Sequence, residues 1–249
     1  MTKVVAITGG SKGIGWAIAT RFAKSGIHVV SGSRNIRNEV PTELQSHYHQ
    51  LEIDVRIPED HHRLAEKAVS LGDEFIAYIN NAGFSEWRAL QNIDRHFLQL
   101  MLETNLMGYF WGTTAAAKRL KPGGSIINIS SLAARRGTPN NSAYVASKFG
   151  VAGLTQSSAK ELGNIGIRVN AICPVLIKTD GLLSALETED SPGSKSVSAF
   201  LDEFSRSQTA LGRLPNAHEV ADLAFYLASE QASAITGQSI NVDCGVLPN

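Results

Sequence analysis

The stretch KVVAITGGSKGIGWAIATRFAK, residues 3–24, determines the fold that we expect for the whole chain. Its first six residues form a short apolar run with β-branched side chains, which predicts a buried strand over residues 3–8. Glycines follow at once, and apolar residues then recur at helical spacing over residues 13–24. A strand that passes through a glycine-rich turn into a helix begins a βαβ unit, so we expect a parallel sheet.

The glycine turn itself predicts a phosphate site. Gly9, Gly13 and Gly15 lie where backbone amides at a helix N-terminus would form a cradle for a pyrophosphate. Their spacing differs from the usual G-x-G-x-x-G dinucleotide pattern. Taken alone the pattern is weak, because a tight strand-to-helix turn places glycines in the same way.

The alternation of strands and helices continues along the chain. Further strands are predicted over residues 27–30, 51–55, 75–79, 125–129, 165–173 and 239–242, and further helices over 59–71, 93–120, 142–162 and 217–229. Such alternation implies right-handed crossovers. We therefore expect an α/β chain with one Rossmann domain over residues 1–249, a doubly wound parallel sheet of about seven strands with helices on both faces.

One segment, residues 179–214, interrupts this rhythm. It is rich in serine and carries an acidic cluster at Glu187, Glu189 and Asp190. Connections this long in compact domains are usually functional or disordered. We predict a substrate lid at about residues 180–213, with a short helix over residues 198–207.

Composition restricts the function classes. The 249 residues are 43% hydrophobic and 18% charged, with 23 basic and 23 acidic side chains and a formal net charge of zero. This balance argues against nucleic-acid and membrane partners. Two cysteines make no disulfide framework. Without a leader before the first strand or an apolar run of membrane-spanning length, a cytoplasmic enzyme is expected.

Three polar side chains predict acid–base chemistry at one edge of the sheet. Ser131 follows the strand over residues 125–129, and Tyr144 and Lys148 lie one turn apart on the next helix. A nearby ammonium lowers the pKa of a phenol from ~10, and a serine hydroxyl can donate to a developing oxyanion. This set suits the interconversion of a carbonyl and an alcohol. Tyr-x-x-x-Lys alone, however, is also an ordinary helix pair.

Several further motifs carry a resemblance. TGGSKGIG at residues 8–15 resembles the T-G-x-x-x-G-x-G signature of classical short-chain dehydrogenases/reductases, and NNAG at residues 80–83 resembles that family's strand end. Matches continue to residue 238, so nearly the whole chain resembles this family, in particular ketoreductases similar to 3-oxoacyl-[acyl-carrier-protein] reductase. The resemblance includes the family's catalytic tetrad, in order and spacing, at Asn105, Ser131, Tyr144 and Lys148.

The resemblance implies a role for each residue of the tetrad. Tyr144 would give the proton to the carbonyl oxygen, and Ser131 would hydrogen-bond that oxygen. Lys148 would hold the nicotinamide ribose and lower the pKa of the phenol. Asn105 would hold a water that links Lys148 to solvent. The hydride would come from the cofactor.

The cofactor site follows in the same way. The resemblance predicts cofactor contacts at Gly9, Ser11, Lys12, Gly13, Ile14, Gly15, Ser33, Arg34, Asp54, Val55, Asn81, Ala82, Gly83, Tyr144, Lys148, Pro174, Ile177 and Thr179. In this set the glycines and the Ile14 amide would contact the pyrophosphate. Asp54 and Val55 would lie on the adenine side, Asn81 by the adenosine ribose, and Thr179 by the nicotinamide carboxamide.

The end of the second strand predicts the choice of cofactor. NAD-binding proteins of this kind place a carboxylate there, whereas this chain has Ser33 and Arg34. A guanidinium can bind a 2′-phosphate in fork geometry, and Lys12 adds a second cation. Solvated surface charges are the competing interpretation. We predict NADP(H) as cofactor and no metal, since His96 lacks ligand partners at metal spacing.

Some positions leave alternatives open. Val175 and Cys244 replace family glycines, which leaves substrate and packing uncertain. Arg135 and Arg136 would bind a carboxylate, a phosphate or a carrier's phosphopantetheine at the mouth of the site, or form a solvated pair.

The aromatic–basic pair Trp87 and Arg88 leaves a similar choice. These residues would line the substrate pocket or lie on an exposed loop.

The leading hypothesis is an NADPH-dependent reductase that converts a ketone, free or carrier-linked, to a secondary alcohol. The alternative is an NADP-dependent alcohol or sugar-derivative dehydrogenase that works oxidatively, and the non-enzyme alternative is an NADP-sensing protein. The long helices around Asn105 and Tyr144 are expected to form a homotetramer or homodimer.

Overall fold

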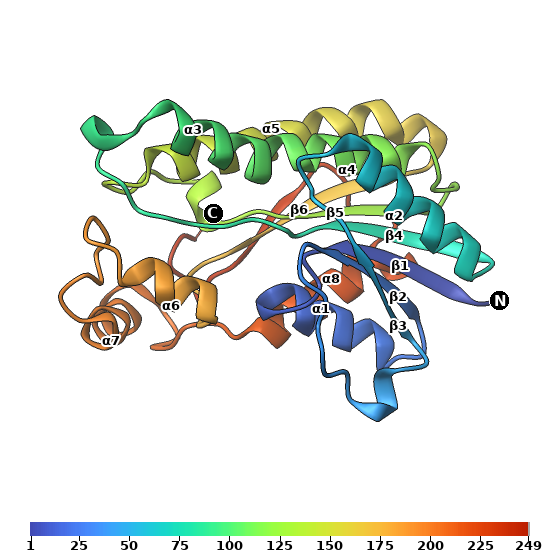
Figure 1. Ribbon diagram of the computed structural model, residues 1–249, viewed down its shortest axis with the longest axis horizontal. Helices are drawn as coiled ribbons and strands as arrows, with labels where there is room; N and C mark the ends of the chain where they lie inside the picture. The colour runs from blue at the N-terminus through green and yellow to red at the C-terminus, as the bar shows by residue number, and fades with distance from the viewer. Residues whose placement is uncertain (249) are drawn as a thin grey trace.

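The computed structural model describes residues 1–248, which are built on one seven-stranded sheet (Figure 1). The strands are β1 (Lys3–Thr8), β2 (His28–Ser33), β3 (Tyr48–Glu52), β4 (Glu74–Asn80), β5 (Ser125–Ile129), β6 (Arg168–Pro174) and β7 (Ser239–Val242). All six neighbouring pairs are parallel, in the order β3-β2-β1-β4-β5-β6-β7. The predicted doubly wound parallel sheet is confirmed.

The strand order places the ligand site. The chain moves outward from β1 to β3, returns to the centre at β4 and then moves outward on the other side. Sheets of this topology bind ligands beyond the carboxyl ends of the strands where the order reverses. Here that point lies between β1 and β4, which pair side by side through Ile7 and Ile79. The glycine turn and the NNAG segment both follow these two strands.

Helices cover both faces of the sheet (Figure 1). They are α1 (Gly13–Ala23), α2 (Pro58–Leu71), α3 (Arg95–Leu102), α4 (Gly108–Ala117), α5 (Ser142–Leu162), α6 (Asp180–Leu186), α7 (Val197–Gln208) and α8 (Ala217–Ala228). Alternate side chains of β1 enter opposite cores because successive strand residues point to opposite faces. Val5 and Ile7 pack with α1 and α8, whereas Val4 and Ala6 pack with α2 and α4. Both faces of the strand are therefore buried, as parallel sheets require.

Four predicted elements have wrong boundaries. The second strand extends to Ser33 rather than ending at residue 30. The third strand spans Tyr48–Glu52 rather than residues 51–55, so the predicted adenine-side pair lies beyond its end. The sixth begins at Arg168 because the chain first makes a short turn over Gly163–Ile165. The helix predicted over residues 93–120 is divided into α3 and α4 by a π-helical turn at Glu103–Met107. Such turns insert one residue into a helix and occur frequently at functional sites.

The segment predicted as a lid contains two helices. α7 confirms the helix expected over residues 198–207, whereas the short helix α6 was not predicted. Their apolar side chains form a separate cluster with Trp87, which is 8% exposed. We refer to Trp87, Ala185, Leu186, Leu201 and the apolar residues packed on them as the lid cluster. It lies apart from both cores that flank the sheet.

The helices of residues 1–248 include none that is both long enough and apolar enough to cross a membrane.

A buried histidine joins α2 to the loop after β3. His61 is fully buried, with Nε2 2.9 Å from the carbonyl oxygen of Val55 and Nδ1 2.8 Å from Oη of Tyr78. The carbonyl can only accept, so Nε2 of the neutral ring donates and Nδ1 accepts from the tyrosine hydroxyl. Both ring nitrogens are satisfied without a charge, and burial lowers the pKa of His61 below 6.5.

This depressed pKa predicts a loss of stability in acid. The unfolded chain binds a proton at this residue near pH 6.5, whereas the folded chain resists it until lower pH. The contribution of His61 is therefore complete above pH 6.5 and is lost as the pH falls through the folded-state pKa, at up to ~1.4 kcal/mol per pH unit. We expect the free energy of unfolding of His61→Gln to depend less steeply on pH between 7 and 5. Urea titrations measure this, and the exposed His96→Gln should keep the wild-type slope.

Candidate active site

The turn between β1 and α1 has a backbone that only glycine allows. Gly9 has φ +70°, and a Cβ on Gly15 would overlap the carbonyl oxygen of Gly9. Lys12, the N-cap residue of α1, makes no side-chain capping hydrogen bond. The first amides of α1 are thus left for a ligand, and helix N-termini favour anions. This geometry fits the pyrophosphate of a dinucleotide.

The end of β4 holds this turn in place. Nδ2 of Asn81 donates to the carbonyl oxygens of Thr8 at 2.9 Å and Gly9 at 3.1 Å. Oγ1 of Thr8 in return accepts from the amides of Asn81 at 3.0 Å and Ala82 at 3.1 Å. Thr179 lies on the other side of the turn, since its Cγ2 would be 3.4 Å from a Cβ on Gly13. The structure therefore brings three separately predicted parts of the cofactor set together.

The end of β2 carries polar groups but no acid. Oγ of Ser33 is buried without a hydrogen-bond partner, and Arg34 beside it is exposed. Arg37 was not predicted from the sequence. Its guanidinium lies 4.0 Å from the centre of the Trp16 ring and donates to the carbonyl oxygen of Ser11 at 3.1 Å. A buried hydroxyl beside an exposed guanidinium offers hydrogen-bond donors to an anionic group at this edge of the sheet.

The predicted adenine-side pair is already bonded within the protein. Oδ2 of Asp54 accepts from Nη2 of Arg56 at 2.5 Å, and this guanidinium lowers the pKa of the carboxyl. The amide of Asp54 donates to Oδ2 of Asp60 at 2.8 Å. The carbonyl of Val55 is bonded to His61. The adenine contact of this pair stays a prediction.

Ser131 and Tyr144 form the acid–base part of the site. Oγ of Ser131 accepts from the amide of Ala133 at 3.1 Å, which leaves its own hydrogen free to donate. The Ser131 hydroxyl lowers the pKa of Tyr144, but burial of the phenol acts more strongly and raises it overall. The expected lowering is therefore not produced by the protein groups alone. A phenol that keeps its proton at neutral pH can act as the acid in a carbonyl reduction.

Lys148 is buried beside the phenol. The residue is 4% exposed, and its Nζ lies 5.7 Å from the centre of the Tyr144 ring. Nζ donates to the carbonyl oxygen of Ile129 at 3.0 Å and to Oη of Tyr109 at 3.3 Å. Burial lowers the pKa of Lys148 to about 8. The sequence alone did not single out Tyr109.

Asn105 lies in the π-helical turn and is fully buried. Its Nδ2 donates to the carbonyl oxygen of Phe84 at 2.7 Å, and its Oδ1 accepts from the amide of Phe84 at 3.0 Å. The side chain thus holds the segment that follows NNAG. Its predicted relay through a water stays a prediction.

The arginine pair after Ser131 is only partly where we expected it. Arg135 donates to the carbonyl oxygen of Ser239 in β7, so this guanidinium is already bonded to the sheet.

Cys244 stands where the family has a glycine, and its backbone is in the left-handed region, with φ +54°.

Trp87 and Arg88 do not lie on an exposed loop, because Trp87 belongs to the lid cluster and Arg88 lies over the ring of Phe97.

Asp190 joins the lid segment to two loops of the site. Its Oδ2 accepts from the amide of Ala89 at 2.9 Å, and its carbonyl oxygen accepts from Nδ2 of Asn140 at 3.0 Å. The carbonyl oxygen of Asn140 in turn accepts from the amide of Arg88 at 2.6 Å. One acidic residue therefore bonds the lid segment to the loops that follow β4 and β5.

Removal of this carboxylate should loosen the lid segment. For Asp190→Ala we expect a loss of ~1.5–3 kcal/mol, the usual worth of a hydrogen bond to a charged group, mainly in the local stability of residues 180–213. Hydrogen exchange of the α6 and α7 amides measures this. Glu189→Ala, at the exposed neighbouring position, is the control. Unchanged exchange in Asp190→Ala would show that the lid cluster alone holds the segment.

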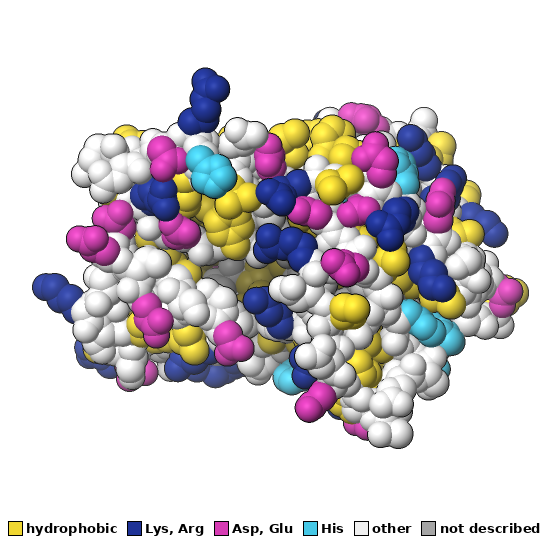
Figure 2. All heavy atoms as spheres, viewed as in Figure 1, with side chains coloured by type: hydrophobic (Ala, Val, Ile, Leu, Met, Phe, Trp, Pro, Cys, Tyr) yellow, Lys and Arg dark blue, Asp and Glu magenta, His cyan; other side chains and the backbone are white. Residues whose placement is uncertain are grey.

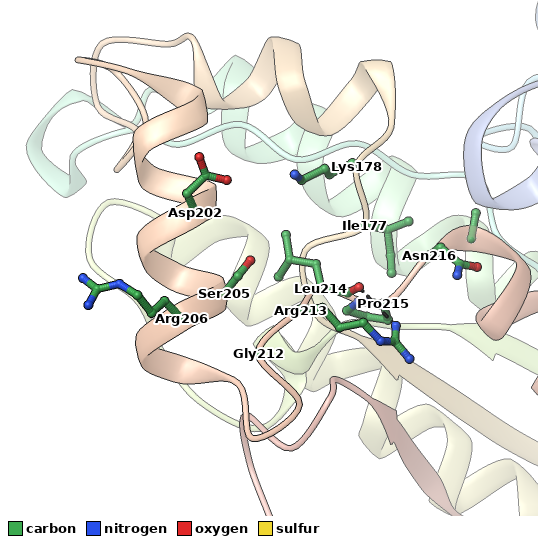
Figure 3. Close-up of a pocket in the computed structure, with 11 residues that line it drawn as sticks. Ile177, Lys178, Asp202, Ser205, Arg206, Gly212, Arg213, Leu214, Pro215 and Asn216 are labelled. Atoms are coloured by element: carbon green, nitrogen blue, oxygen red, sulfur yellow. Dashed lines mark hydrogen bonds between the residues drawn. The ribbon is translucent and has the colours of Figure 1, made fainter.

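A cavity of about 480 Å³ opens between α7 and the segment before α8 (Figure 3). Ile177, a predicted cofactor contact, lies on its wall, and the Lys178 side chain points toward α7. Arg213 on the same wall is paired with Glu219 at 2.7 Å. The surface is also hollowed between the lid helices and α1, beyond the carboxyl ends of the strands (Figure 2).

Within residues 1–248 no group of three or more His, Cys, Asp or Glu side chains could hold a metal.

The fold and the site define a class of protein: a Rossmann-type oxidoreductase that acts on an alcohol and carbonyl pair with a nicotinamide cofactor. Known proteins support this class. A family model described as enoyl-(acyl carrier protein) reductase matches residues 9–247. L-rhamnose-1-dehydrogenase of Scheffersomyces stipitis is 33% identical over 260 aligned residues, covering 99% of this chain and 96% of that protein.

Solved structures agree. The ligand-free aldohexose dehydrogenase of Thermoplasma acidophilum has a TM-score of 0.88 and 32% identity, covering 98% of this chain and 94% of that one. A variant of actinorhodin polyketide ketoreductase with NADPH has a TM-score of 0.88 and 29% identity, covering 98% and 97%. The chain belongs to the short-chain dehydrogenase/reductase family.

Proposed function

We propose that this protein uses NADPH to reduce a ketone to a secondary alcohol. The acid within electrostatic reach of Arg34 is Asp54, which is paired with Arg56 at 2.5 Å. The observation that carries the choice of cofactor is the end of β2, where the buried Ser33 hydroxyl has no hydrogen-bond partner within residues 1–248 and the exposed Arg34 follows it, with no carboxylate in residues 31–36. A carboxylate there would repel a 2′-phosphate, whereas these groups would bind it. A related ketoreductase was solved with NADPH, which agrees with this choice.

The cofactor would be held along the carboxyl edge of the sheet. Its pyrophosphate would lie on the amides of the β1–α1 turn, and its 2′-phosphate on Ser33, Arg34 and Lys12. When bound, the nicotinamide supplies the hydride. Thr179 and Ile177, on the segment after β6, would orient the nicotinamide ring.

Side chains of the protein would supply the proton and stabilise the negative charge that develops on the carbonyl oxygen. Tyr144 would give its phenol proton to the carbonyl oxygen, while Ser131 donates a hydrogen bond to that oxygen. The Lys148 ammonium would stabilise the phenolate and bind the nicotinamide ribose. Asn105 would hold the water through which Lys148 exchanges protons with solvent.

A second candidate function is oxidation of a hydroxyl in a sugar or another polyol with NADP⁺. Two similar proteins carry sugar dehydrogenase names, L-rhamnose-1-dehydrogenase and aldohexose dehydrogenase, which favours it. The same four side chains would serve the reverse reaction, since acid and base exchange roles. The third candidate, an NADP sensor, would bind the cofactor without turnover.

Initial rates with NADPH and NADH, and with both oxidised cofactors, test these alternatives. The reductive panel would run from small diketones and cyclic ketones to acyl thioesters, and the oxidative panel would contain aldoses and vicinal diols. Reduction with NADPH at least tenfold faster than with NADH would support the proposal. Faster oxidation of sugars would favour the second candidate. Tight NADPH binding without turnover in either panel would favour the sensor.

We also propose that the protein assembles as a homotetramer or homodimer through α4 and α5. Large apolar side chains are exposed on these helices and on the turn before α4, with Met107 at 42%, Phe110 at 46% and Phe149 at 47%. Exposed apolar side chains that gather into a patch mark interfaces, and we infer such a patch here. Light scattering after gel filtration measures the mass, and a monomer at micromolar concentration would contradict the proposal.

A further inference from the structure

Tyr109 is hydrogen-bonded to Lys148, and neither the sequence motifs nor the family resemblance predicted a role for it. It lies in the first turn of α4, is 1% exposed, and packs against Val151 and Leu154 of α5. Its Oη donates to the carbonyl oxygen of Ile129 at 2.7 Å and lies 3.3 Å from Nζ of Lys148. Nζ also bonds the Ile129 carbonyl at 3.0 Å, so the three groups form a closed triangle.

The donors in this triangle can be assigned. A carbonyl oxygen only accepts, so the single hydrogen of the Tyr109 hydroxyl is used on Ile129. Oη therefore faces Nζ as an acceptor. The Lys148 ammonium has three hydrogens, of which one goes to Ile129 and one to Tyr109. No protein acceptor within residues 1–248 takes the third, and the centre of the Tyr144 ring lies 5.7 Å from Nζ.

We propose that Tyr109 is a positioning residue that fixes the Lys148 ammonium and aims its remaining hydrogen at the reacting groups. This inference rests on the proposed function, in which Lys148 binds the nicotinamide ribose and stabilises the Tyr144 phenolate. Tyr109 acts through Lys148 and does not itself contact the substrate.

The helix that carries Tyr109 is held firmly. The π-helical turn before it is bonded through Asn105 to Phe84. One turn later, a Cβ on Gly112 would overlap Oδ1 of Asn80, so α4 packs against β4 without a gap. The position of the Tyr109 hydroxyl relative to Lys148 is therefore fixed by the packing of α4, so the ammonium is already oriented before a ligand binds.

The partners of Lys148 are neutral. None of the ion pairs in residues 1–248 includes it. The titratable groups around it are Tyr109 of α4, Tyr144 of α5 and Cys173 of β6. Without a carboxylate nearby, hydrogen bonds to neutral oxygens oppose the loss of the ammonium proton that burial promotes. Removal of one acceptor should therefore lower the pKa of Lys148.

The experiment compares Tyr109→Phe with the wild-type protein in two ways. In the protein without cofactor, lysines carrying ¹³C at Cε are titrated by NMR, and Lys148→Arg assigns the Lys148 signal. We expect Tyr109→Phe to lower the midpoint of Lys148 by about one pH unit. The alkaline limb of kcat/KM for NADPH should move down by the same amount, with kcat reduced roughly tenfold.

Tyr78→Phe is the matched control, because Tyr78 is equally buried and its hydroxyl is bonded to His61 on α2. It should lower the melting temperature as Tyr109→Phe does, yet leave the Lys148 titration and the alkaline limb in place. If Tyr109→Phe does not fold, Tyr109→Met fills the space with a flexible side chain and should give the same shift.

An unchanged Lys148 midpoint in a folded Tyr109 variant would overturn the inference, whatever the activity. A lowered midpoint in a protein that oxidises no NADPH would instead reject the proposed function while supporting the coupling of Tyr109 to Lys148. The NMR titration needs no cofactor or substrate, so the two failures are distinguishable.

Discussion

Replacement of Tyr144 by Phe is expected to lower kcat by ~10²–10⁴, the range that a positioned general acid contributes. The phenol is the proton source that the site offers to a carbonyl oxygen, since Ser131 is a far weaker acid. Phe keeps the ring and its packing beside Ala143, Phe97 and Met101. The dissociation constant of NADPH should therefore change less than threefold, because most cofactor contacts lie elsewhere.

Single-turnover NADPH oxidation, together with NADPH titration by fluorescence, separates these two quantities. Tyr226→Phe is the control: this hydroxyl, on a 38% exposed residue of α8, donates to the Gln231 carbonyl oxygen at 3.3 Å. It should retain wild-type kcat. A Tyr144→Phe protein within tenfold of wild type would show that another group supplies the proton.

The second large effect is expected at the end of β2. Arg34→Ala should raise the dissociation constant of NADPH by ~10–100-fold, because a charge-assisted hydrogen bond to a phosphate is lost. Ser33→Asp should weaken NADPH binding at least as much, since it places a carboxylate beside the 2′-phosphate. NADH lacks that phosphate, so its affinity should not fall in Arg34→Ala.

Calorimetric titration with both cofactors measures the change in preference. Arg21→Ala provides a matched loss of charge, because Arg21 lies at the other end of α1 and is paired with Asp222 at 2.7 Å. Equal losses of NADPH and NADH affinity in Arg34→Ala would contradict the assignment. Loss of NADPH affinity in Arg37→Ala but not in Arg34→Ala would move the phosphate site to the guanidinium over Trp16.

The fold could be predicted from sequence where elements are buried on both sides. β1 and β5 consist mainly of buried apolar residues, and their positions were correct to the residue. β3 was misplaced by three residues because it is an edge strand in which His49 and Gln50 are partly exposed, so its apolar pattern is weak. The π-helical turn was missed because residues 93–120 contain no proline that would mark an interruption of the helix.

The site was predictable where chemistry depends on residue type and order. Ser131, Tyr144 and Lys148 were identified from their motifs, and the structure places them at the same edge of the sheet. Tyr109 and Arg37 were missed because their importance depends on which atoms lie opposite. In the sequence the first is only an aromatic residue in a helix. The second is a basic residue in a loop whose path no local pattern predicts.

The lid cluster has an evolutionary consequence. Trp87, Leu186 and Leu201 pack with the lid's own apolar side chains and share no residue with the two cores under the sheet. The role of this segment as a substrate lid stays a prediction; on that prediction, mutations that reshape the cluster would alter which molecules enter while the global stability of the scaffold is spared, since distant sites contribute independently. A chain built in this way can acquire a new specificity by a few neighbouring substitutions. We therefore expect descendants of this protein to differ from one another more in the residues of the lid cluster than in those of the sheet.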